Sequence, residues 1–291
     1  MTHVLVGLAI GDALGAPFET QHFTSTLLAG WCGEYLGSSF HGTKAGEGTD
    51  DTLMTLALAE VLTAGPYNAA AAAARYAEVY RQYPNRGWGK ATTTALEKIE
   101  DGYPWTRTGS HSEGNGSAMR AAPFGLAYSP DAAARVARED AVITHDTHEA
   151  REGSAAVAIA IAELRVEPQQ SPTQVVHRVL SRLAPSQVRD RLKKILHDSW
   201  ESPLQMLITM GTGAHVVETV PAALGTLLVA KSFKEAITCA IQAGGDTDTV
   251  AAITGAVWGA IEAPPELWLR DLHAGTRERA QDLEKRILSH D

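Results

Sequence analysis

The stretch AGGDTDTV at residues 243–250 places two carboxylates, Asp246 and Asp248, directly before an apolar segment. Residues two apart on a helix do not face each other, so these carboxylates converge only if a helix begins inside the stretch. One interpretation is a simple N-cap, because aspartate and threonine cap helices well and the helix dipole favours negative charge there. A cap needs only one such side chain, however, and the following VAAITGAVWGA predicts a buried helix. Paired carboxylates at a buried helix start destabilise the fold unless a cation compensates them.

The same arrangement occurs earlier in the chain, in GEGTDDT at residues 46–52. Here Thr49 precedes Asp50 and Asp51, glycine again stands before the acids, and a largely apolar helix is predicted to follow. If both helix starts meet, four carboxylates and the neighbouring threonine hydroxyls share one site. All these donors are oxygens, which favours the hard cations Mg²⁺, Mn²⁺ or Ca²⁺ over zinc. Four carboxylates suit two divalent ions better than one.

Other metal and phosphate motifs fit less well. The segment DDTLM lacks the third acid of an Asp-Asp-x-x-Asp prenyl-diphosphate motif, and it has no glycine at the loop position of an EF-hand. His145 and Asp146 resemble the core of a His-Asp phosphohydrolase, but the separate histidine and aspartate ligands of that class are not evident. The chain contains no Gly-x-x-x-x-Gly-Lys-Ser/Thr phosphate loop.

The composition predicts the scaffold that must bring these stretches together. Of the 291 residues, 44% are hydrophobic and 20% are charged, which fits a globular protein with an extensive interior. Alanine is frequent, whereas β-branched and aromatic clusters are sparse, so helices are favoured over strands. We expect helices at 3–16, 51–64, 67–83, 88–100, 118–128, 131–143, 148–165, 172–183, 187–198, 217–230, 233–243 and 248–262.

Two details refine this helical scaffold. Glycines at 7, 11 and 15 recur every four residues, which predicts a core helix packed closely on a neighbour along one face. Asp12 lies inside this apolar helix and is expected to be a structural carboxylate with satisfied hydrogen bonds. The stretches 30–48 and 101–117 resist helix formation, and long loops of this kind are often functional.

Charge and cysteine content limit the classes of partner and compartment. The net charge of −9 argues against an extended nucleic-acid surface and against an anionic-membrane surface. Cys32 and Cys239 form neither a disulfide framework nor a zinc pair, which favours a reducing compartment. The first residues lack a basic leading region, and no stretch supplies the roughly 20 apolar residues of a membrane span. We therefore expect a cytoplasmic protein, and we expect a monomer.

The motifs together resemble those of the ADP-ribosylglycohydrolase family, the enzymes related to dinitrogenase-reductase-activating glycohydrolase. The matching stretches are GLAIGDALGAPFE (7–19), GTDDT (48–52), GNGSAMRAAPFGL (114–126), THDTHEA (144–150) and GGDTDTVAAITGAVWGA (244–260). The resemblance implies an all-α, compact, single-domain orthogonal bundle over residues 1–291, with a cleft that holds two divalent ions, Mg²⁺ or Mn²⁺.

The resemblance also implies roles for individual residues. Glu19 matches a mobile glutamate near the metals, and Asp50, Asp248 or Glu19 could take the proton in catalysis. His145 matches a substrate-contacting position, although a lone histidine could equally brace the fold. Arg120 is expected to be structural. The implied metal ligands are Thr49, Asp50, Asp51, Asp246, Asp248 and Thr249, and the implied substrate-binding loop is Gly114, Asn115, Gly116 and Ser117.

The function that the resemblance implies is hydrolysis of the glycosidic bond between ADP-ribose and a modified protein side chain, with release of ADP-ribose. Arginine linkage is favoured and serine linkage is possible; ADP-ribosylated proteins or small molecules that contain ADP-ribose are the expected partners. Two alternatives stay open, a non-catalytic ADP-ribose binding module and a dinuclear-metal nucleotide phosphohydrolase. The loops at 20–47 and 101–113 are expected to shape the outer pocket.

Overall fold

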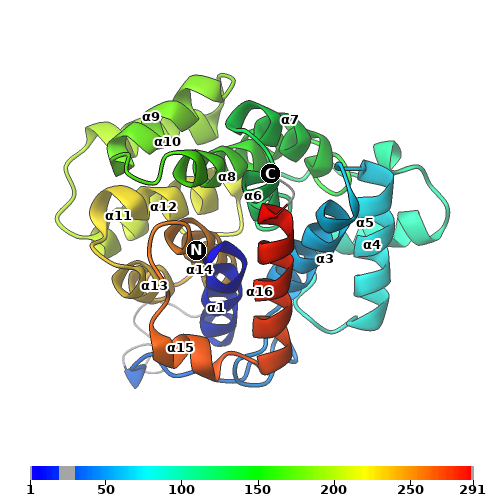
Figure 1. Ribbon diagram of the computed structural model, residues 1–291, viewed down its shortest axis with the longest axis horizontal. Coiled ribbons are helices and arrows are strands. Elements are labelled where there is room, and N and C mark those ends of the chain that lie inside the picture. Colours follow the sequence, from blue (N-terminus) through cyan, green and yellow to red (C-terminus); the bar gives the residue numbers. More distant parts are fainter. Residues whose placement is uncertain (1, 20–29, 290–291) are drawn as a thin grey trace.

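The computed structural model describes residues 2–19 and 30–289, and these residues form an all-α fold (Figure 1). Strand pairing within them is limited to isolated bridges, such as the one between Ser38 and Thr43. The predicted all-α class is therefore confirmed. The helices are α1 (Val4–Gly15), η1 (Ala16–Phe18), α3 (Asp50–Ala64), α4 (Ala69–Gln82), α5 (Lys90–Glu100), η2 (Trp105–Arg107), α6 (Ala122–Ala127), α7 (Pro130–Ala141), α8 (His148–Val166), α9 (Pro172–Arg182), α10 (Gln187–His197), α11 (Pro203–Met210), α12 (Val216–Val229), α13 (Phe233–Gln242), α14 (Thr247–Gly259), α15 (Glu266–Asp271) and α16 (Ala274–Leu288).

Every predicted helix has a counterpart, but the prediction missed α11, α15 and α16. Helices α11 and α15 are only 8 and 6 residues long, too short for a clear apolar periodicity. Helix α16 is rich in charge and begins at an N-cap histidine, so it lacks the usual start signal. The predicted helix 118–128 begins later, at Ala122, because the preceding residues form turns on the carbonyl of Asn115.

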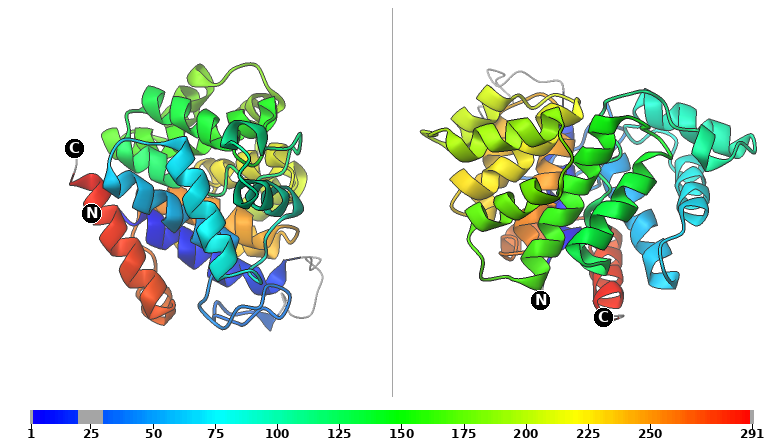
Figure 2. Two further views of the ribbon diagram at one scale, coloured as in Figure 1. Left: turned by 90° about the vertical axis from the view of Figure 1, so that its right-hand side faces the viewer. Right: turned by 90° about the horizontal axis from the view of Figure 1, so that it is seen from above.

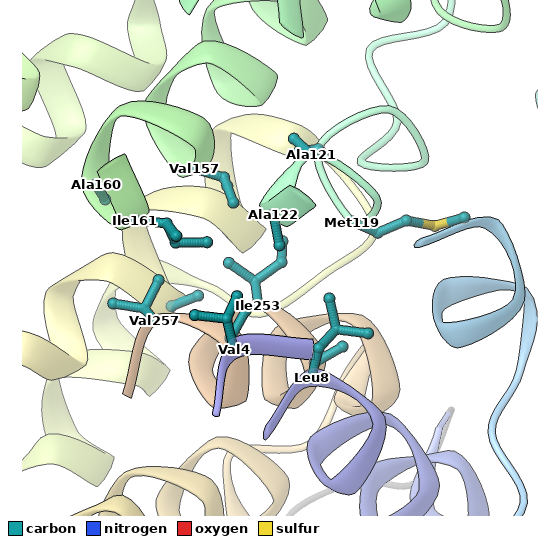
Figure 3. Packing of buried hydrophobic residues seen from close by; sticks show 14 of the residues in the cluster. Val4, Leu8, Met119, Ala121, Ala122, Val157, Ala160, Ile161, Ile253 and Val257 are labelled. Carbon is teal, nitrogen blue, oxygen red and sulfur yellow. The ribbon is translucent and has the colours of Figure 1, made fainter. Parts of the chain in front are cut away.

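The core of the molecule lies between α1, α14, α6 and α8 (Figure 3). Val4 and Leu8 of α1 pack with Ile253 and Val257 of α14, and Val157 of α8 closes the cluster from the other side. Helices α4 and α5 lie on the opposite side of this core from α9, α10, α11 and α13 (Figures 1 and 2). No helix in the described part of the chain is both long and apolar enough to cross a membrane.

Helices α1 and α14 touch backbone to backbone. A Cβ atom added at Gly11 would lie 2.0 Å from the carbonyl oxygen of Ala251, and one added at Gly15 would lie 2.4 Å from that of Thr247. Gly7 makes the same kind of approach one turn earlier, so the predicted glycine face is confirmed as a close helix contact. Any side chain along this face would force the two helices apart. The contact therefore fixes where α14 begins.

The unpredicted helix α16 holds the start of α1. The buried carboxylate of Glu284 accepts hydrogen bonds from the backbone N–H groups of Val4 and Leu5, at 3.1 and 2.9 Å, and from the hydroxyl of Thr2 at 2.6 Å. These N–H groups belong to the first turn of α1 and have no partner inside the helix. The C-terminal helix thus satisfies the buried N-terminus of the helix that organises the core.

Candidate active site

The starts of α3 and α14 meet in the interior. Thr49 caps α3 and Asp246 caps α14, in each case by accepting a hydrogen bond from a backbone N–H two or three residues later. The hydroxyl of Thr249 donates to Asp51 Oδ2 at 3.3 Å and so joins two segments separated by 198 positions in the sequence. The two acidic stretches therefore share one site, as their parallel sequences predict.

Helix α1 positions both helix starts. The carboxylate of Asp12 accepts hydrogen bonds from the backbone N–H groups of Thr49 and Thr52, at 2.9 and 3.0 Å, and from both of their hydroxyls. Asp12 is fully buried, and the expectation that it is a satisfied structural carboxylate is confirmed. On the same helix, the carbonyl of Gly15 accepts a 2.8 Å hydrogen bond from the hydroxyl of Thr247. One helix thus sets the position of the acids on both others.

The acids at this meeting point are buried close to one another. Burial raises the pKa of Asp50, Asp51 and Asp248 well above the usual range; the charge of Asp246 raises all three further, and that of Asp12 raises the pKa of Asp50 and Asp51. The described residues provide no hydrogen-bond partner for Asp51 Oδ1, which is buried. A cluster of mutually repelling carboxylate oxygens, one of them without a partner among the described residues, is the kind of donor set that hard divalent cations bind. The residues present therefore fit Mg²⁺ or Mn²⁺.

The loop that contains Asn115 closes over these acids. The Asn115 amide donates to Asp246 Oδ2 at 2.8 Å and to the hydroxyl of Thr219 at 3.0 Å, so Asn115 holds an acid in place. The structure does not bring the side chain of Ser117 to the cavity. Its hydroxyl lies on α8, donating to the carbonyl of Ala150 and accepting from Ser154.

His145 lies beside this loop and is braced by Arg120. Burial and the nearby guanidinium of Arg120 lower the pKa of His145 to about 3, so its imidazole is neutral. The Thr144 hydroxyl accepts from Arg120 at 2.9 Å and lies 2.9 Å from His145 Nδ1. Since arginine only donates, the hydroxyl proton is available for Nδ1, which leaves the imidazole proton on Nε2. A Cβ at Gly116 would lie 2.7 Å from this ring, so glycine is needed there for packing.

Sequence reasoning missed His41, in the loop that was expected only to shape the outer pocket. Residues 20–29 of that loop lie outside the described part of the chain, but His41 is buried directly against the acids. Its Nε2 lies 2.5 Å from Glu19 Oε2 and 3.6 Å from Asp248 Oδ2. The only signal was a single histidine in a glycine- and serine-rich stretch that resists helix formation.

A cavity of about 270 Å³ opens above the acids. Among the described residues that line it, Lys90 at the start of α5 is the only lysine or arginine, and sequence reasoning did not single it out. Thr49 lies behind the lining, with its hydroxyl turned toward Asp12 at 2.9 Å. The predicted site residues that line the cavity are Glu19, Asp50, Asp51, Gly114, Asn115, Gly116, His145, Asp246, Asp248 and Thr249.

Comparison with known proteins gives consistent matches along the chain. The family model described as ADP-ribosylglycohydrolase matches residues 1–291. A protein of Archaeoglobus fulgidus described as uncharacterized is 34% identical over 277 residues, covering 92% of this chain and 90% of the relative. The ADP-ribosylhydrolase ARH3 of Mus musculus is 28% identical over 315 residues, covering 91% of this chain and 85% of the relative.

Two further matches bear on activity and fold. The ADP-ribosylarginine hydrolase Tri1 of Pseudomonas putida is 28% identical over 280 residues, covering 90% of this chain and 71% of the relative. A solved structure named ADP-ribosylglycohydrolase-related protein complex superposes with a TM-score of 0.78 at 30% identity, covering 98% of this chain and 95% of the other. The similarity in sequence and in fold extends over nearly the whole chain.

Proposed function

The chain belongs to the ADP-ribosylglycohydrolase family, and from this premise we propose that it is a dinuclear-metal-dependent hydrolase that releases ADP-ribose from a modified side chain. The observation that carries the proposal is the meeting of two buried acidic helix starts beneath a cavity. Asp51 of α3 and Asp248 of α14 are both raised in pKa by burial and by neighbouring acids, so bound cations would relieve an existing repulsion.

The donors proposed for the two ions come from the same two helix starts. Aspartate and threonine oxygens suit Mg²⁺ or Mn²⁺. Asn115 would not bind the ions itself, but its hydrogen bond to Asp246 would orient that ligand. The proposed ligands are Thr49, Asp50, Asp51, Asp246, Asp248 and Thr249.

Hydrolysis of a glycosidic bond passes through an oxocarbenium-like state, and water must reach one face of the sugar. Divalent ions supply the Lewis acidity that orients sugar hydroxyls and lowers the pKa of water. Among the three proton acceptors proposed from the sequence, the Glu19 side chain is 22% exposed whereas that of Asp248 is 5% exposed. We favour Glu19, because a proton taken there can pass to solvent, while Asp50 and Asp248 stay committed to cations.

The cavity lining supports a substrate that carries phosphate groups. Lys90 stands at the rim of an otherwise acidic cavity, where its ammonium group could pair with the diphosphate of ADP-ribose. The neutral His145 would offer its Nε2 proton as a hydrogen-bond donor to the substrate. For the leaving group we favour arginine, since one relative is named as an ADP-ribosylarginine hydrolase, and serine is the second choice.

The test is turnover of peptides that carry ADP-ribose on arginine or on serine, with products identified by mass spectrometry. We expect intact ADP-ribose from the arginine-linked peptide, loss of turnover with EDTA, and recovery with Mg²⁺ or Mn²⁺. Asp246→Asn should lose turnover by more than the ~10–100-fold that removal of an outer-shell partner costs.

Other products would indicate other functions. AMP or phosphate from a nucleotide would indicate a phosphohydrolase, and binding of ADP-ribose with no product from any peptide would indicate a binding module. Metal-independent release of ADP-ribose, or full turnover by Asp246→Asn, would contradict the proposed mechanism.

A further inference from the structure

His41 is a buried nitrogen donor inside a site otherwise made of oxygens. It is 2% exposed and belongs to the irregular stretch before α3, where the ring of Phe40 packs edge-on against it at 4.7 Å between centroids. Its Nε2 points between the carboxylates of Glu19 and Asp248. One nitrogen and two carboxylate oxygens, one from each of these three residues, all lie within 4.8 Å of one another.

The imidazole of His41 lies close to two acids but, among the described residues, is not hydrogen-bonded in good geometry. Within the described residues, neither Nδ1 nor Nε2 makes an aligned hydrogen bond, although Nε2 is close to two acids. Buried polar atoms are almost always paired, and the 2.5 Å contact of Nε2 with Glu19 leaves Asp248 Oδ2, at 3.6 Å, without a direct bond to the ring. A neutral imidazole nitrogen has a free electron pair, and the partner that suits it beside carboxylates is a metal ion.

We propose that His41 Nε2 is a ligand of one of the two metal ions and shares that ion with Asp248, so that the site prefers Mn²⁺ or Fe²⁺ over Mg²⁺. This inference rests on the proposed metal-dependent function and refines it. Two donors that bind one ion at roughly 2.1 Å lie about 3–4 Å apart, and the observed 3.6 Å between His41 Nε2 and Asp248 Oδ2 falls in this range. Imidazole selects transition ions, whereas an all-oxygen set suits Mg²⁺.

The contact of His41 with Glu19 is compatible with this role. At 2.5 Å it is shorter than the spacing of two ligands on one ion, so His41 Nε2 and Glu19 Oε2 would not both bind the same ion in this arrangement. An ion on Nε2 would replace the contact, and the 22% exposed Glu19 side chain has solvent to move into. Glu19 would then be free to accept a proton, as proposed above.

The test uses Mn²⁺ alone on the EDTA-stripped full chain. Bound Mn²⁺ is examined by pulsed electron paramagnetic resonance for coupling to histidine ¹⁴N, with ¹⁵N-histidine protein as the isotopic check. His41→Gln keeps the size and polarity of the side chain but offers an oxygen or amide. His177→Gln, on the exposed side of α9, is the matched control. Competition between Mn²⁺ and Mg²⁺ is measured on the same three proteins.

We expect the nitrogen coupling in the wild type and in His177→Gln, and its loss in His41→Gln. The preference for Mn²⁺ over Mg²⁺ should fall at least ~10-fold in His41→Gln, the low end of effects seen at metal sites. If His41→Gln does not fold, the coupling is measured in His145→Gln, which changes the histidine that lines the cavity, and its persistence there assigns it to His41. Stoichiometric Mn²⁺ without nitrogen coupling would reduce His41 to a partner of Glu19 and overturn the inference while the proposed function stands. No Mn²⁺ binding at all would overturn both.

Discussion

Two groups of buried charges lie close together in this molecule, and they are treated in opposite ways. In the first, the guanidinium of Arg120 is fully buried and donates to Asp140 Oδ2 at 2.8 Å. Tyr67 and Tyr76 donate to the other oxygen of Asp140, and the Tyr76 ring lies 4.8 Å from the guanidinium. In the second group, the acid cluster of Asp50, Asp51, Asp246 and Asp248, the described residues that line the cavity include no buried lysine or arginine.

The difference indicates that the Arg120 network stabilises the fold, whereas the acid cluster is suited to bind a ligand. The Arg120 network satisfies itself, and it extends toward the site by donating to the carbonyl of Gly116 at 2.7 Å and to the hydroxyl of Thr144. It thereby fixes the loop that covers the cavity. The acid cluster has the opposite property, because burial and neighbouring acids raise the pKa of Asp51, and its Oδ1 has no partner among the described residues. The paired charges of the Arg120 network thus hold the loop that covers the site, and the acid cluster lines the site beneath that loop.

The largest expected effect follows from a substitution in the Arg120 network. Asp140→Asn leaves the Arg120 guanidinium buried without a counter-ion, and breaking a buried pair in this way costs about 3–5 kcal/mol. We expect the free energy of unfolding, measured by urea denaturation of the metal-free protein, to fall by that amount. Asp51→Asn removes one of several mutually repelling acids, so the same measurement should show no loss, or a gain.

These two substitutions replace the same residue type by the same amide at buried positions, so each is the control for the other. Equal destabilisation by Asp51→Asn and Asp140→Asn would mean that the acid cluster is structural and that the contrast is false. Full stability of Asp140→Asn would show that the Arg120 network contributes nothing to the fold.

The sequence was informative where the signal is local. The starts of α3 and α14 could be predicted because glycine, threonine and aspartate cluster there before an apolar run. The glycine face of α1 was equally readable from its four-residue spacing. Helix α16 could not be predicted in this way, because its role depends on a hydrogen bond between Glu284 and the start of α1, 280 positions away.

The parts of the site that could not be predicted depend on partners brought together only by folding. Nothing near His41 in the sequence indicates that Asp248 will lie 3.6 Å from its ring. The hydrogen bond from Asn115 to Asp246 spans 131 positions, and the local pattern around Asn115 suggests only a turn or a substrate loop. The family resemblance places Ser117 in that loop, but the turn directs its side chain to α8.

An effect of intermediate size is expected on metal affinity when Asn115 is replaced. Asn115 connects the covering loop to the acid cluster, since its amide orients Asp246 at 2.8 Å. We expect Asn115→Ala to lower Mn²⁺ affinity by ~10–100-fold without substrate present, as loss of an outer-shell partner does. Ser117→Ala, in the same loop but outside the cavity, should leave the affinity unchanged, because the Ser117 hydroxyl contacts Ala150 and Ser154 of α8 and none of the acids. Unchanged metal binding in Asn115→Ala would restrict Asn115 to substrate contact.

The smallest effect concerns His145, which burial and, secondarily, the charge of Arg120 hold neutral. The pKa of His145 is lowered to about 3, so the folded protein binds fewer protons than the unfolded chain as pH falls below about 6.5. Stability is therefore lost on acidification through that window. Between pH 7 and pH 5.5 the loss assigned to this one group is ~1 kcal/mol, from the linkage slope of about 1.4 kcal/mol per pH unit.

Acidification changes the stability contributed by His145 and by the acid cluster in opposite directions. The acids whose pKa is raised by burial, such as Asp50 and Asp248, bind protons more readily when folded and so favour the folded state on acidification. His145 responds in the opposite direction, and both contributions are present in the wild type. His145→Gln removes only the contribution of His145. Its unfolding free energy, followed by urea denaturation from pH 7 to pH 5.5, should therefore fall ~1 kcal/mol less than that of the wild type. Parallel pH profiles for the two proteins would mean that His145 titrates normally and that Arg120 does not control it.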